Sequence, residues 1–229
     1  MEIDKIYNED CLVGMADLPK DHKYCIVTDP PFNIGYHYDE YDDKKDEGEY
    51  YEWLDAITKG YPIVMIHYPE ALYKFAFQIG QFPDRVVSWV YNSNTPRQHR
   101  DIAFFGVKPD FTLMRQPYKN PTDKRIAKRI AEGHEGGALY DWWEINQIKN
   151  VSKKGQVVHP CQMPIDVMRR VVGIIPPEYV IIDPFMGSGT TALACIKENR
   201  HFIGFELSPD YYRLACARIR AEQAQHSLF

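Results

Sequence analysis

One stretch of the sequence decides the fold: Asp183-Pro184-Phe185-Met186-Gly187-Ser188-Gly189-Thr190. The β-branched apolar run 179–182 before it is typical of a buried strand, and residues 191–199 after it have a helical pattern. A strand, a tight glycine turn and a helix N-terminus form a nucleotide-binding corner, because glycine lets a ligand approach the backbone. A second predicted strand, 201–205, ends at Glu206.

Glu206 comes about 20 residues after the turn, the spacing at which a carboxylate accepts hydrogen bonds from ribose hydroxyls. A P-loop is excluded because Gly189 is followed by Thr190 rather than by lysine. The dinucleotide fingerprint is excluded because its third glycine is absent. The stretch therefore predicts a nucleoside ligand without a pyrophosphate. The alternative is a glycine turn before a packing helix.

Length and composition predict one globular domain with an insertion. A chain of 229 residues can bury one sizeable core, and its 45% hydrophobic and 26% charged content fits a soluble protein. The start is not a signal peptide, and no apolar run approaches membrane length. The five cysteines are scattered and lack metal-ligand spacing. These features predict a cytoplasmic protein with reduced thiols, no membrane contact and no metal.

Positive charge is concentrated in one part of a chain whose net charge is −5. Residues 85–154 contain 13 Lys or Arg and 7 Asp or Glu, whereas the remainder contains 14 basic and 25 acidic residues. A basic segment on an acidic body suggests a face for an anionic polymer, although a charged run is usually a solvated surface.

Strand and helix patterns alternate along most of the chain. Further strands are predicted at 5–8, 24–28, 63–67, 85–91 and 102–107, and further helices up to 18 and at 50–57, 69–79, 164–174 and 209–223. This alternation predicts an α/β fold with a doubly wound, mostly parallel sheet. Residues 33–49 have no period and are predicted to form a mobile lid over a site.

The alternating pattern is lost between residues 110 and 156. We interpret this region as a small insertion with one basic helix at 123–132. The adjacent Trp142 and Trp143 are interpreted as the local core of that insertion rather than as groups that intercalate into nucleic acid.

A second motif, Asp29-Pro30-Pro31-Phe32, follows the predicted strand 24–28, at the edge where doubly wound sheets bind ligands. Two prolines fix the backbone and remove two N–H donors, so carbonyl oxygens and the Asp29 carboxylate remain as acceptors beside an aromatic ring. This set suits a planar ring that carries an exocyclic amino group and stacks on Phe32. The alternative is a turn with a core phenylalanine.

Together the motifs resemble the S-adenosylmethionine-dependent DNA amino-methyltransferases of the β order, in which the catalytic tetrapeptide precedes the cofactor loop. Residues 29–32 match D-P-P-Y/F, and residues 183–191 match D-P-F-x-G-S-G-T-T. Residues 204–211 match the ribose-binding strand end, 159–164 resemble H-P-T-Q-K-P, and 8–11 resemble the element that touches adenine. The resemblance therefore spans nearly the whole chain. Cys161 and Met163 depart from the usual Thr and Lys, which leaves open how that segment holds the cofactor.

The resemblance implies a Rossmann-like methyltransferase fold with a permuted motif order. Residues 1–109 would be the catalytic half, 110–156 an inserted target-recognition region and 157–229 the cofactor-binding half. The implied reaction is methyl transfer from S-adenosylmethionine to adenine N6 of a base flipped out of double-stranded DNA, as in restriction-modification. A homodimer, a cognate restriction nuclease and the recognition sequence are left open.

The resemblance also implies roles for particular residues. The catalytic residues would be Asp29, Pro30, Pro31 and Phe32. The cofactor-binding residues would be Asp10, Cys11, His159, Pro160, Gln162, Asp183, Phe185, Gly187, Ser188, Gly189, Thr190, Glu206 and Leu207. DNA would be bound by Lys124, Arg125, Lys128 and Arg129 of the basic helix.

Three alternatives compete with adenine N6 methylation. Cytosine N4 methylation uses the same fold, but members of this order that act on N4 more often begin the tetrapeptide with Ser than with Asp. Residues 160–162 resemble the Pro-Cys-Gln of cytosine C5 methyltransferases, in which a cysteine attacks the ring. In those enzymes the motif follows the cofactor loop, whereas here it precedes the loop. A catalytically silent DNA-binding subunit would have no chemical need for Asp29 and Phe32.

Overall fold

The structure, a computed structural model, describes residues 1–36, 41, 43–148 and 162–226. A central sheet has the strand order β1-β10-β9-β2-β3-β5-β4-β8. Its strands are β1 (Lys5–Tyr7), β2 (Lys23–Thr28), β3 (Ile63–His67), β4 (Arg85–Val90), β5 (His99–Phe105), β8 (Trp142–Glu144), β9 (Tyr179–Asp183) and β10 (Phe202–Phe205). The pairings of β5 with β3 and β4 are antiparallel, and the other pairings in this sheet are parallel. The predicted α/β fold with a mostly parallel sheet is confirmed.

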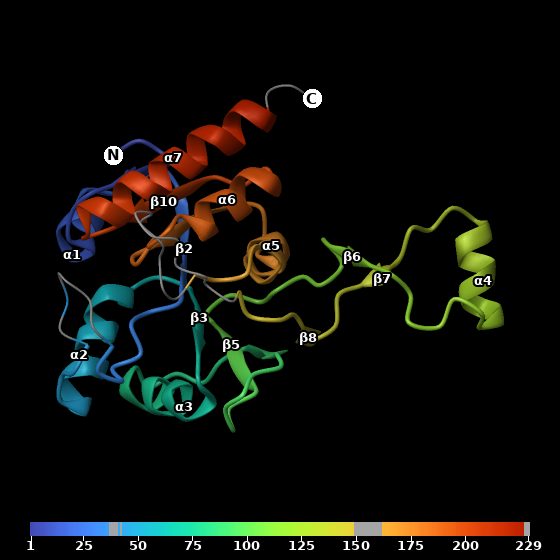
Figure 1. The fold of residues 1–229 in the computed structure, drawn as a ribbon, viewed down its shortest axis with the longest axis horizontal. Helices are drawn as coiled ribbons and strands as arrows, with labels where there is room; N and C mark the ends of the chain where they lie inside the picture. The colour runs from blue at the N-terminus through green and yellow to red at the C-terminus, as the bar shows by residue number, and fades with distance from the viewer. Residues whose placement is uncertain (37–40, 42, 149–161, 227–229) are drawn as a thin grey trace.

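Helices cover both faces of the sheet, as a doubly wound fold requires. They are α1 (Cys11–Gly14), α2 (Glu47–Thr58), α3 (Pro69–Gln78), α5 (Ile165–Ile174), α6 (Thr190–Lys197) and α7 (Pro209–His226), with a short 3₁₀ turn at Met15–Asp17. Helices α2 and α3 lie on one side of the sheet, and α5, α6 and α7 lie on the other (Figure 1). Each side has its own hydrophobic core.

Strand β2 shows why the central strands are continuous apolar runs. Cys25 and Val27 belong to the core beneath α5, α6 and α7, whereas Tyr24 and Ile26 belong to the core beneath α1, α2 and α3. Successive side chains of a strand point to opposite faces, so a strand covered on both faces must be apolar at every position.

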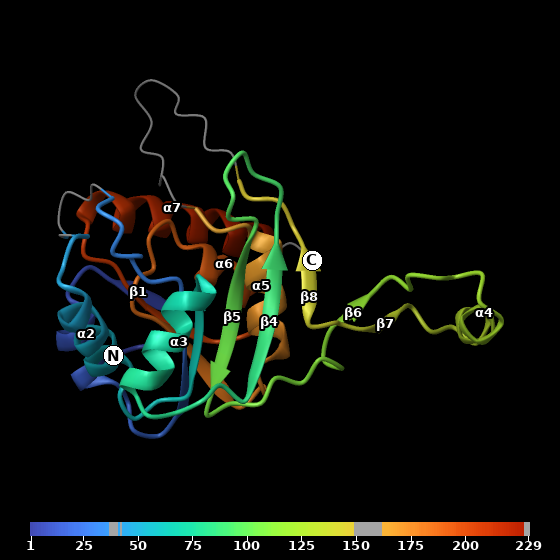
Figure 2. The same cartoon turned by 90° about the horizontal axis from the view of Figure 1, so that it is seen from below.

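A long arm projects from this body (Figures 1 and 2). Its neck is a two-stranded ribbon of β6 (Arg115–Gln116) and β7 (Gly137–Ala138), and its tip is helix α4 (Lys124–Ala131). The Asp123 side chain caps α4 by accepting hydrogen bonds from the backbone N–H groups of Arg125 and Ile126 at 2.9 and 3.4 Å. No residue of α4 is buried, so the predicted basic helix stands free of the core.

Strand β8 lies inside the predicted insertion but joins the main sheet. It runs parallel to β4 and places Trp143 opposite Trp89. The interpretation of both tryptophans as the local core of the insertion is therefore wrong for Trp143, which is fully buried in the main core. Trp142 points to the other face and is 46% exposed. The sheet thus extends by one parallel edge strand beyond the predicted pattern.

None of the helices in the described ranges combines the length and apolar composition needed to span a bilayer.

The two tryptophans of β8 provide a matched test of this packing. Trp143→Ala should lower the free energy of unfolding by about 3–5 kcal/mol, because it leaves a large cavity in the main core. Trp142→Ala, one residue away and half exposed, should lower it by less than about 1 kcal/mol. Guanidinium chloride titration of both variants measures the difference. Equal effects would show that β8 is not part of the core in solution.

Candidate active site

The carboxyl ends of the parallel strands meet at one edge of the sheet, where the structure has a cavity of about 470 Å³. Asp29 follows β2, Asp183 ends β9 and Glu206 follows β10. From the neighbouring strands β2 and β9, the chain continues in opposite directions across the sheet, to β3 and to β10. Doubly wound sheets bind ligands at such a switch point, in the crevice outside the strand ends.

Most residues predicted for catalysis and cofactor binding line this one cavity. They are Asp10, Cys11, Asp29, Pro30, Pro31, Phe32, Gln162, Asp183, Phe185, Gly187, Ser188, Thr190, Glu206 and Leu207. The predicted contacts His159 and Pro160 lie outside the described residues. Folding therefore brings both motifs together with segments from near both ends of the chain.

Gly189 is the exception among the described cofactor residues, because it does not line the cavity. It precedes α6 with a φ of 83°, in the left-handed region that favours glycine. A Cβ atom on Gly189 would lie 3.0 Å from the Cβ of Ala215 in α7. The turn and the close packing of α7 therefore require this glycine, and a cofactor contact at Gly189 stays a prediction.

Asp183 organises the glycine turn from the end of β9. One carboxylate oxygen accepts a hydrogen bond from the Phe185 N–H at 3.0 Å, and the other accepts a short bond from the Thr191 hydroxyl. Burial raises the pKa of Asp183 to about 7, although both hydrogen bonds oppose this shift. The carboxyl group is thus a structural clamp of the turn in a low-dielectric surrounding.

Glu206 ties the other side of the turn to β10. Its carboxylate accepts hydrogen bonds from the N–H groups of Gly187 at 2.7 Å and Ser208 at 2.8 Å. The Asn8 amide donates to the carbonyl oxygens of Glu206 and Leu207 at 2.8 and 3.0 Å, which joins the end of β1 to the same point. Glu206 also lines the cavity, and a carboxylate is the acceptor that the expected ribose hydroxyls require.

Asp29 lines the cavity and has one carboxylate oxygen without a partner in the described part of the chain. Its Oδ2 lies 3.7 Å from Nη1 of Arg100, whereas its Oδ1 is buried and has no hydrogen-bond partner among the residues that the structure describes. Burial raises the pKa of Asp29 to about 6, and the charge of Arg100 partly offsets that effect. A buried acceptor without a partner costs about 1–3 kcal/mol, a cost that a ligand N–H would remove.

Phe32 is held by a hydrogen-bonded group that the sequence analysis missed. The imidazole of His67 stacks on it with ring centres 4.2 Å apart and planes 27° apart. His67 Nδ1 accepts from the Tyr68 backbone N–H at 2.7 Å, so Nε2 carries the proton and donates to the Tyr50 hydroxyl at 3.1 Å. That hydroxyl donates to the Pro31 carbonyl at 2.7 Å.

Burial lowers the pKa of His67 to about 3, so this ring is neutral at physiological pH. The network from His67 to Pro31 therefore fixes the backbone and the ring of the tetrapeptide from behind. The available signal in the sequence was a polar residue at the end of an apolar strand, at the edge where ligands bind.

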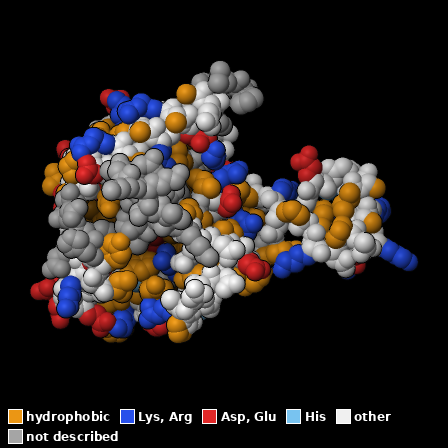
Figure 3. Space-filling model, in the orientation of Figure 1, with side chains coloured by type: hydrophobic (Ala, Val, Ile, Leu, Met, Phe, Trp, Pro, Cys, Tyr) orange, Lys and Arg blue, Asp and Glu red, His pale blue; other side chains and the backbone are white. Residues whose placement is uncertain are grey.

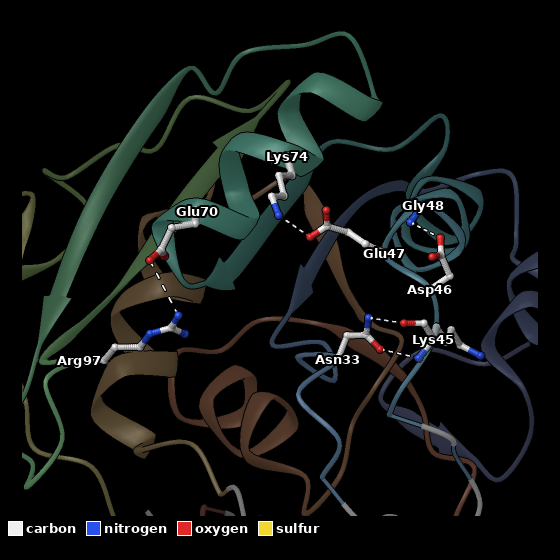
Figure 4. A network of polar contacts seen from close by, with 8 residues as sticks. All are labelled: Asn33, Lys45, Asp46, Glu47, Gly48, Glu70, Lys74 and Arg97. Atoms are coloured by element: carbon white, nitrogen blue, oxygen red, sulfur yellow. Dashed lines mark hydrogen bonds and ion pairs between the residues drawn. The ribbon is translucent and has the colours of Figure 1, made fainter.

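Asp43 orders the described part of the predicted lid. Its buried carboxylate accepts hydrogen bonds from the N–H groups of Asn33, Ile34 and Tyr36 at 2.8, 3.2 and 2.9 Å. The Asn33 side chain exchanges two hydrogen bonds with the Lys45 backbone, at 2.9 and 2.7 Å (Figure 4). The two ends of the loop are thereby tied together beside the cavity, which both line.

The basic helix does not meet this cavity. Lys124, Arg125, Lys128 and Arg129 lie on α4 at the tip of the arm, and all four are exposed. In the space-filling view the arm stands clear of the body (Figure 3). The structure therefore separates the predicted DNA-binding residues from the predicted chemistry.

Glu206→Ala should weaken the binding of S-adenosylmethionine by about 1.5–3 kcal/mol, because a charged acceptor for a ribose hydroxyl is lost. Glu198→Ala is the matched control, since Glu198 pairs with Arg169 at 2.6 Å outside the cavity. Calorimetric titration with the cofactor gives both affinities. If Glu206→Ala binds as tightly as the control, the ribose lies elsewhere.

Comparison with known proteins gives a family match over most of the chain. The family model N6_N4_Mtase, described as DNA methylase, matches residues 24–217. The Type II methyltransferase M.BglII of Bacillus subtilis is 25% identical over 263 residues, which cover 99% of this chain and 72% of the relative. M.HpaI of Haemophilus parainfluenzae is 28% identical over 218 residues, which cover 86% of this chain and 68% of the relative.

Solved structures share the fold at lower identity. The PvuII DNA methyltransferase, titled cytosine-N4-specific, has a TM-score of 0.66 at 17% identity, covering 97% of this chain and 91% of that one. The M1.HpyAVI complex with SAM has a TM-score of 0.57 at 20% identity, covering 94% and 98%. These likenesses concern the fold, whereas the family match concerns the sequence motifs themselves. The chain belongs to the DNA methylase family, the S-adenosylmethionine-dependent N6 and N4 methyltransferases of DNA, as its motif order predicted.

Proposed function

We propose that this chain methylates the N6 amino group of adenine in double-stranded DNA. The observation that carries the proposal is Asp29 at the head of the tetrapeptide, with a buried Oδ1 that lacks a partner in the described part of the chain. An exocyclic amino group would supply the missing donor. The aspartate also favours adenine over cytosine, since relatives of this order that act on cytosine N4 more often have serine there.

The cavity fits the cofactor that the family uses. S-adenosylmethionine carries its methyl group on a sulfonium sulfur and supplies it as an electrophile. Glu206 would hold the ribose, and the turn 183–190, tied to β9 and β10, would lie against the nucleoside. These hydrogen bonds would hold the turn in one conformation against the nucleoside, and a preorganised site lowers the entropic cost of binding.

The tetrapeptide would prepare the amino nitrogen for attack. An amino group on an aromatic ring is a poor nucleophile, because its lone pair is delocalised into the ring. Asp29 and the Pro30 carbonyl would accept its two hydrogens and favour a more tetrahedral nitrogen. Attack by the nitrogen lone pair on the methyl group that the cofactor would supply releases one amino proton, which Asp29 or water would accept.

The reacting amino group is inaccessible inside duplex DNA, so the base must be flipped into the cavity. Phe32, fixed by His67, would offer its ring to the flipped base, and such stacking contributes about 1–3 kcal/mol. We further propose that α4, within the inserted region 110–156, binds the DNA phosphates. Its four basic side chains are exposed and lie on one short helix.

The decisive experiment identifies the methylated base directly. The protein is expressed in a bacterial host without DNA methyltransferases of its own, and the DNA is digested to nucleosides for mass spectrometry and sequenced for modified positions. N6-methyladenine in one sequence context is expected. Detection of N4-methylcytosine instead would show that the substrate is cytosine, which also carries an exocyclic amino group beside a ring nitrogen. An absence of methylation would indicate a silent subunit.

Asp29→Asn should lower turnover by about a hundredfold or more, because it replaces the charged acceptor with a neutral amide of the same shape. Asp101→Asn is the control: Asp101 lies in β5, accepts a bond from the Ser88 hydroxyl at 2.9 Å and should be dispensable. Methyl transfer to DNA from labelled cofactor measures both. Near-normal turnover of Asp29→Asn would contradict the assignment.

The raised pKa of Asp29 adds a pH dependence to this prediction. Activity should fall as the pH drops through about 6, because protonation removes the charge and an acceptor site. The free energy of unfolding should change in the opposite direction: it should rise as the pH drops, because the fold disfavours the ionised form of Asp29. Asp29→Asn should therefore be more stable than the wild type above about pH 6 and lose this advantage near pH 4.

Replacing Lys124, Arg125, Lys128 and Arg129 by Gln should weaken DNA binding and flatten its salt dependence. Each lost phosphate contact lowers the log–log salt slope by about one unit. The control replaces four exposed basic residues on the body: Lys20, Lys23, Lys59 and Arg220. Fluorescence anisotropy over a salt series gives both slopes. Equal slopes would place the DNA on another face.

A further inference from the structure

Arg100 reaches the cavity from the start of β5. Because β5 runs antiparallel to β3 and β4, its first residues lie at the edge where the parallel strands end. The side chain is 15% exposed, and its guanidinium lies 3.7 Å from Asp29 Oδ2 and 4.7 Å from the centre of the Phe32 ring. The guanidinium therefore lies against both groups that are proposed to hold the target base.

The guanidinium offers these two groups the same chemistry as an amino-bearing base. It is planar, stacks on aromatic rings and directs N–H donors at carboxylates. A flipped base is also planar, stacks on aromatic side chains and carries N–H donors at its edge. The separation from Asp29 is longer than a hydrogen bond, so the arginine occupies the place without satisfying the open acceptor.

Phe32 and Arg100 differ in how far each side chain can rearrange. Phe32 is stacked on His67, whose two ring nitrogens are both hydrogen-bonded. The Arg100 guanidinium also lies 5.8 Å from the centre of the Tyr68 ring and 5.5 Å from that of the Trp89 ring. Its side chain is long and has several rotamers, whereas the Phe32 ring is stacked in place. A base that needs the space beside Asp29 would therefore displace the guanidinium rather than the ring.

We propose that Arg100 occupies the place of the target base in the free protein and withdraws when the base enters. The proposal rests on the proposed function and adds a role for Arg100: its displacement contributes to the free-energy cost of flipping the base into the cavity. In the free protein the arginine has a second effect: its charge lowers the pKa of Asp29 against the effect of burial. The carboxylate is thus kept available for the incoming amino group.

Two DNA duplexes separate the cost of base entry from all other contacts. An intact target base must displace Arg100, whereas an abasic target position requires no displacement. Both duplexes make the same phosphate contacts, so these cancel in the ratio of the Kd for the intact duplex to the Kd for the abasic duplex. The free-energy cost of displacing Arg100 affects only the intact duplex and therefore raises this ratio. If only a fraction of the molecules has the place beside Asp29 open, the apparent Kd for the intact duplex equals the intrinsic Kd divided by that fraction.

The test measures this ratio for wild type and Arg100→Met on the recognition sequence mapped in the host DNA, with S-adenosylhomocysteine present to prevent turnover. Methionine keeps an apolar stem but has no charge and no N–H donor. In Arg100→Met the ratio should be about tenfold lower than in the wild type. This is the value expected if Arg100 leaves the place of the base open in about one wild-type molecule in ten. Arg100→Lys, which keeps the charge but not the planar group, should give an intermediate ratio.

Arg97→Met is the matched control. Arg97 lies over the Tyr68 ring at 4.2 Å and 3.9 Å from Glu70 (Figure 4), and it does not line the cavity. The Kd ratio of Arg97→Met should therefore equal that of the wild type. Cofactor affinity and thermal unfolding check that each variant is folded. If Arg100→Met does not fold, the ratio measured for Arg100→Lys tests the proposal instead.

Two outcomes would overturn the proposal. An unchanged ratio in Arg100→Met would mean that the base does not need the place of Arg100. A higher ratio would mean that Arg100 binds the flipped base directly. Methyl transfer by the wild type to the intact duplex is measured in parallel. If transfer occurs and the ratio does not fall, only the role of Arg100 is wrong; if no transfer occurs, the proposed function fails as well.

Discussion

The parallel pairing of β2 with β9 is the interaction on which the site depends. It joins the first third of the chain to the last, with Ile26 opposite Ile182 at the site end of the register. Each strand then ends in an aspartate, Asp29 or Asp183, and these enter the same cavity. Since the sheet is covered by helices on both faces, this pairing is buried and its register is fixed by two hydrophobic cores. A slip by one residue would turn every side chain of β2 to the wrong face.

The same burial that fixes the register makes the site electrostatically costly. Asp29 and Asp183 both have raised pKa values because they are desolvated, and the negative charges of Asp29 and Glu206 raise the pKa of Asp183 further. Backbone N–H groups and the Thr191 hydroxyl compensate Asp183, whereas Asp29 has the Arg100 charge nearby and one oxygen open. Such incompletely satisfied groups are expected where a protein gives up stability for function. In this protein the uncompensated acceptor is the one proposed to hold the substrate.

The body and the arm carry different groups of predicted site residues. The body holds every described residue of the cavity, and the arm carries the free basic helix. Strand β8 connects the two, because it follows the arm in the chain and yet pairs with β4 and buries Trp143 in the main core. The base of the arm is thus anchored to the sheet that carries the chemistry. A DNA duplex bound by α4 would therefore be held at a defined position relative to the cavity.

The α/β class, both motifs and most of the cavity lining could be predicted from the sequence alone, because strand patterns and turn residues are local signals. The sequence could also place Asp29, Asp183 and Glu206 at strand ends, and parallel strands bring such ends together. Only the tertiary structure added His67, Tyr50 and Asp43, whose roles come from hydrogen bonds between segments distant in sequence. It also showed that Gly189 packs closely against α7 and that Trp143 belongs to the main core. Arg100 shows the reason most clearly: a strand pattern has no direction, and only the antiparallel pairing of β5 puts the start of that strand, rather than its end, beside the cavity.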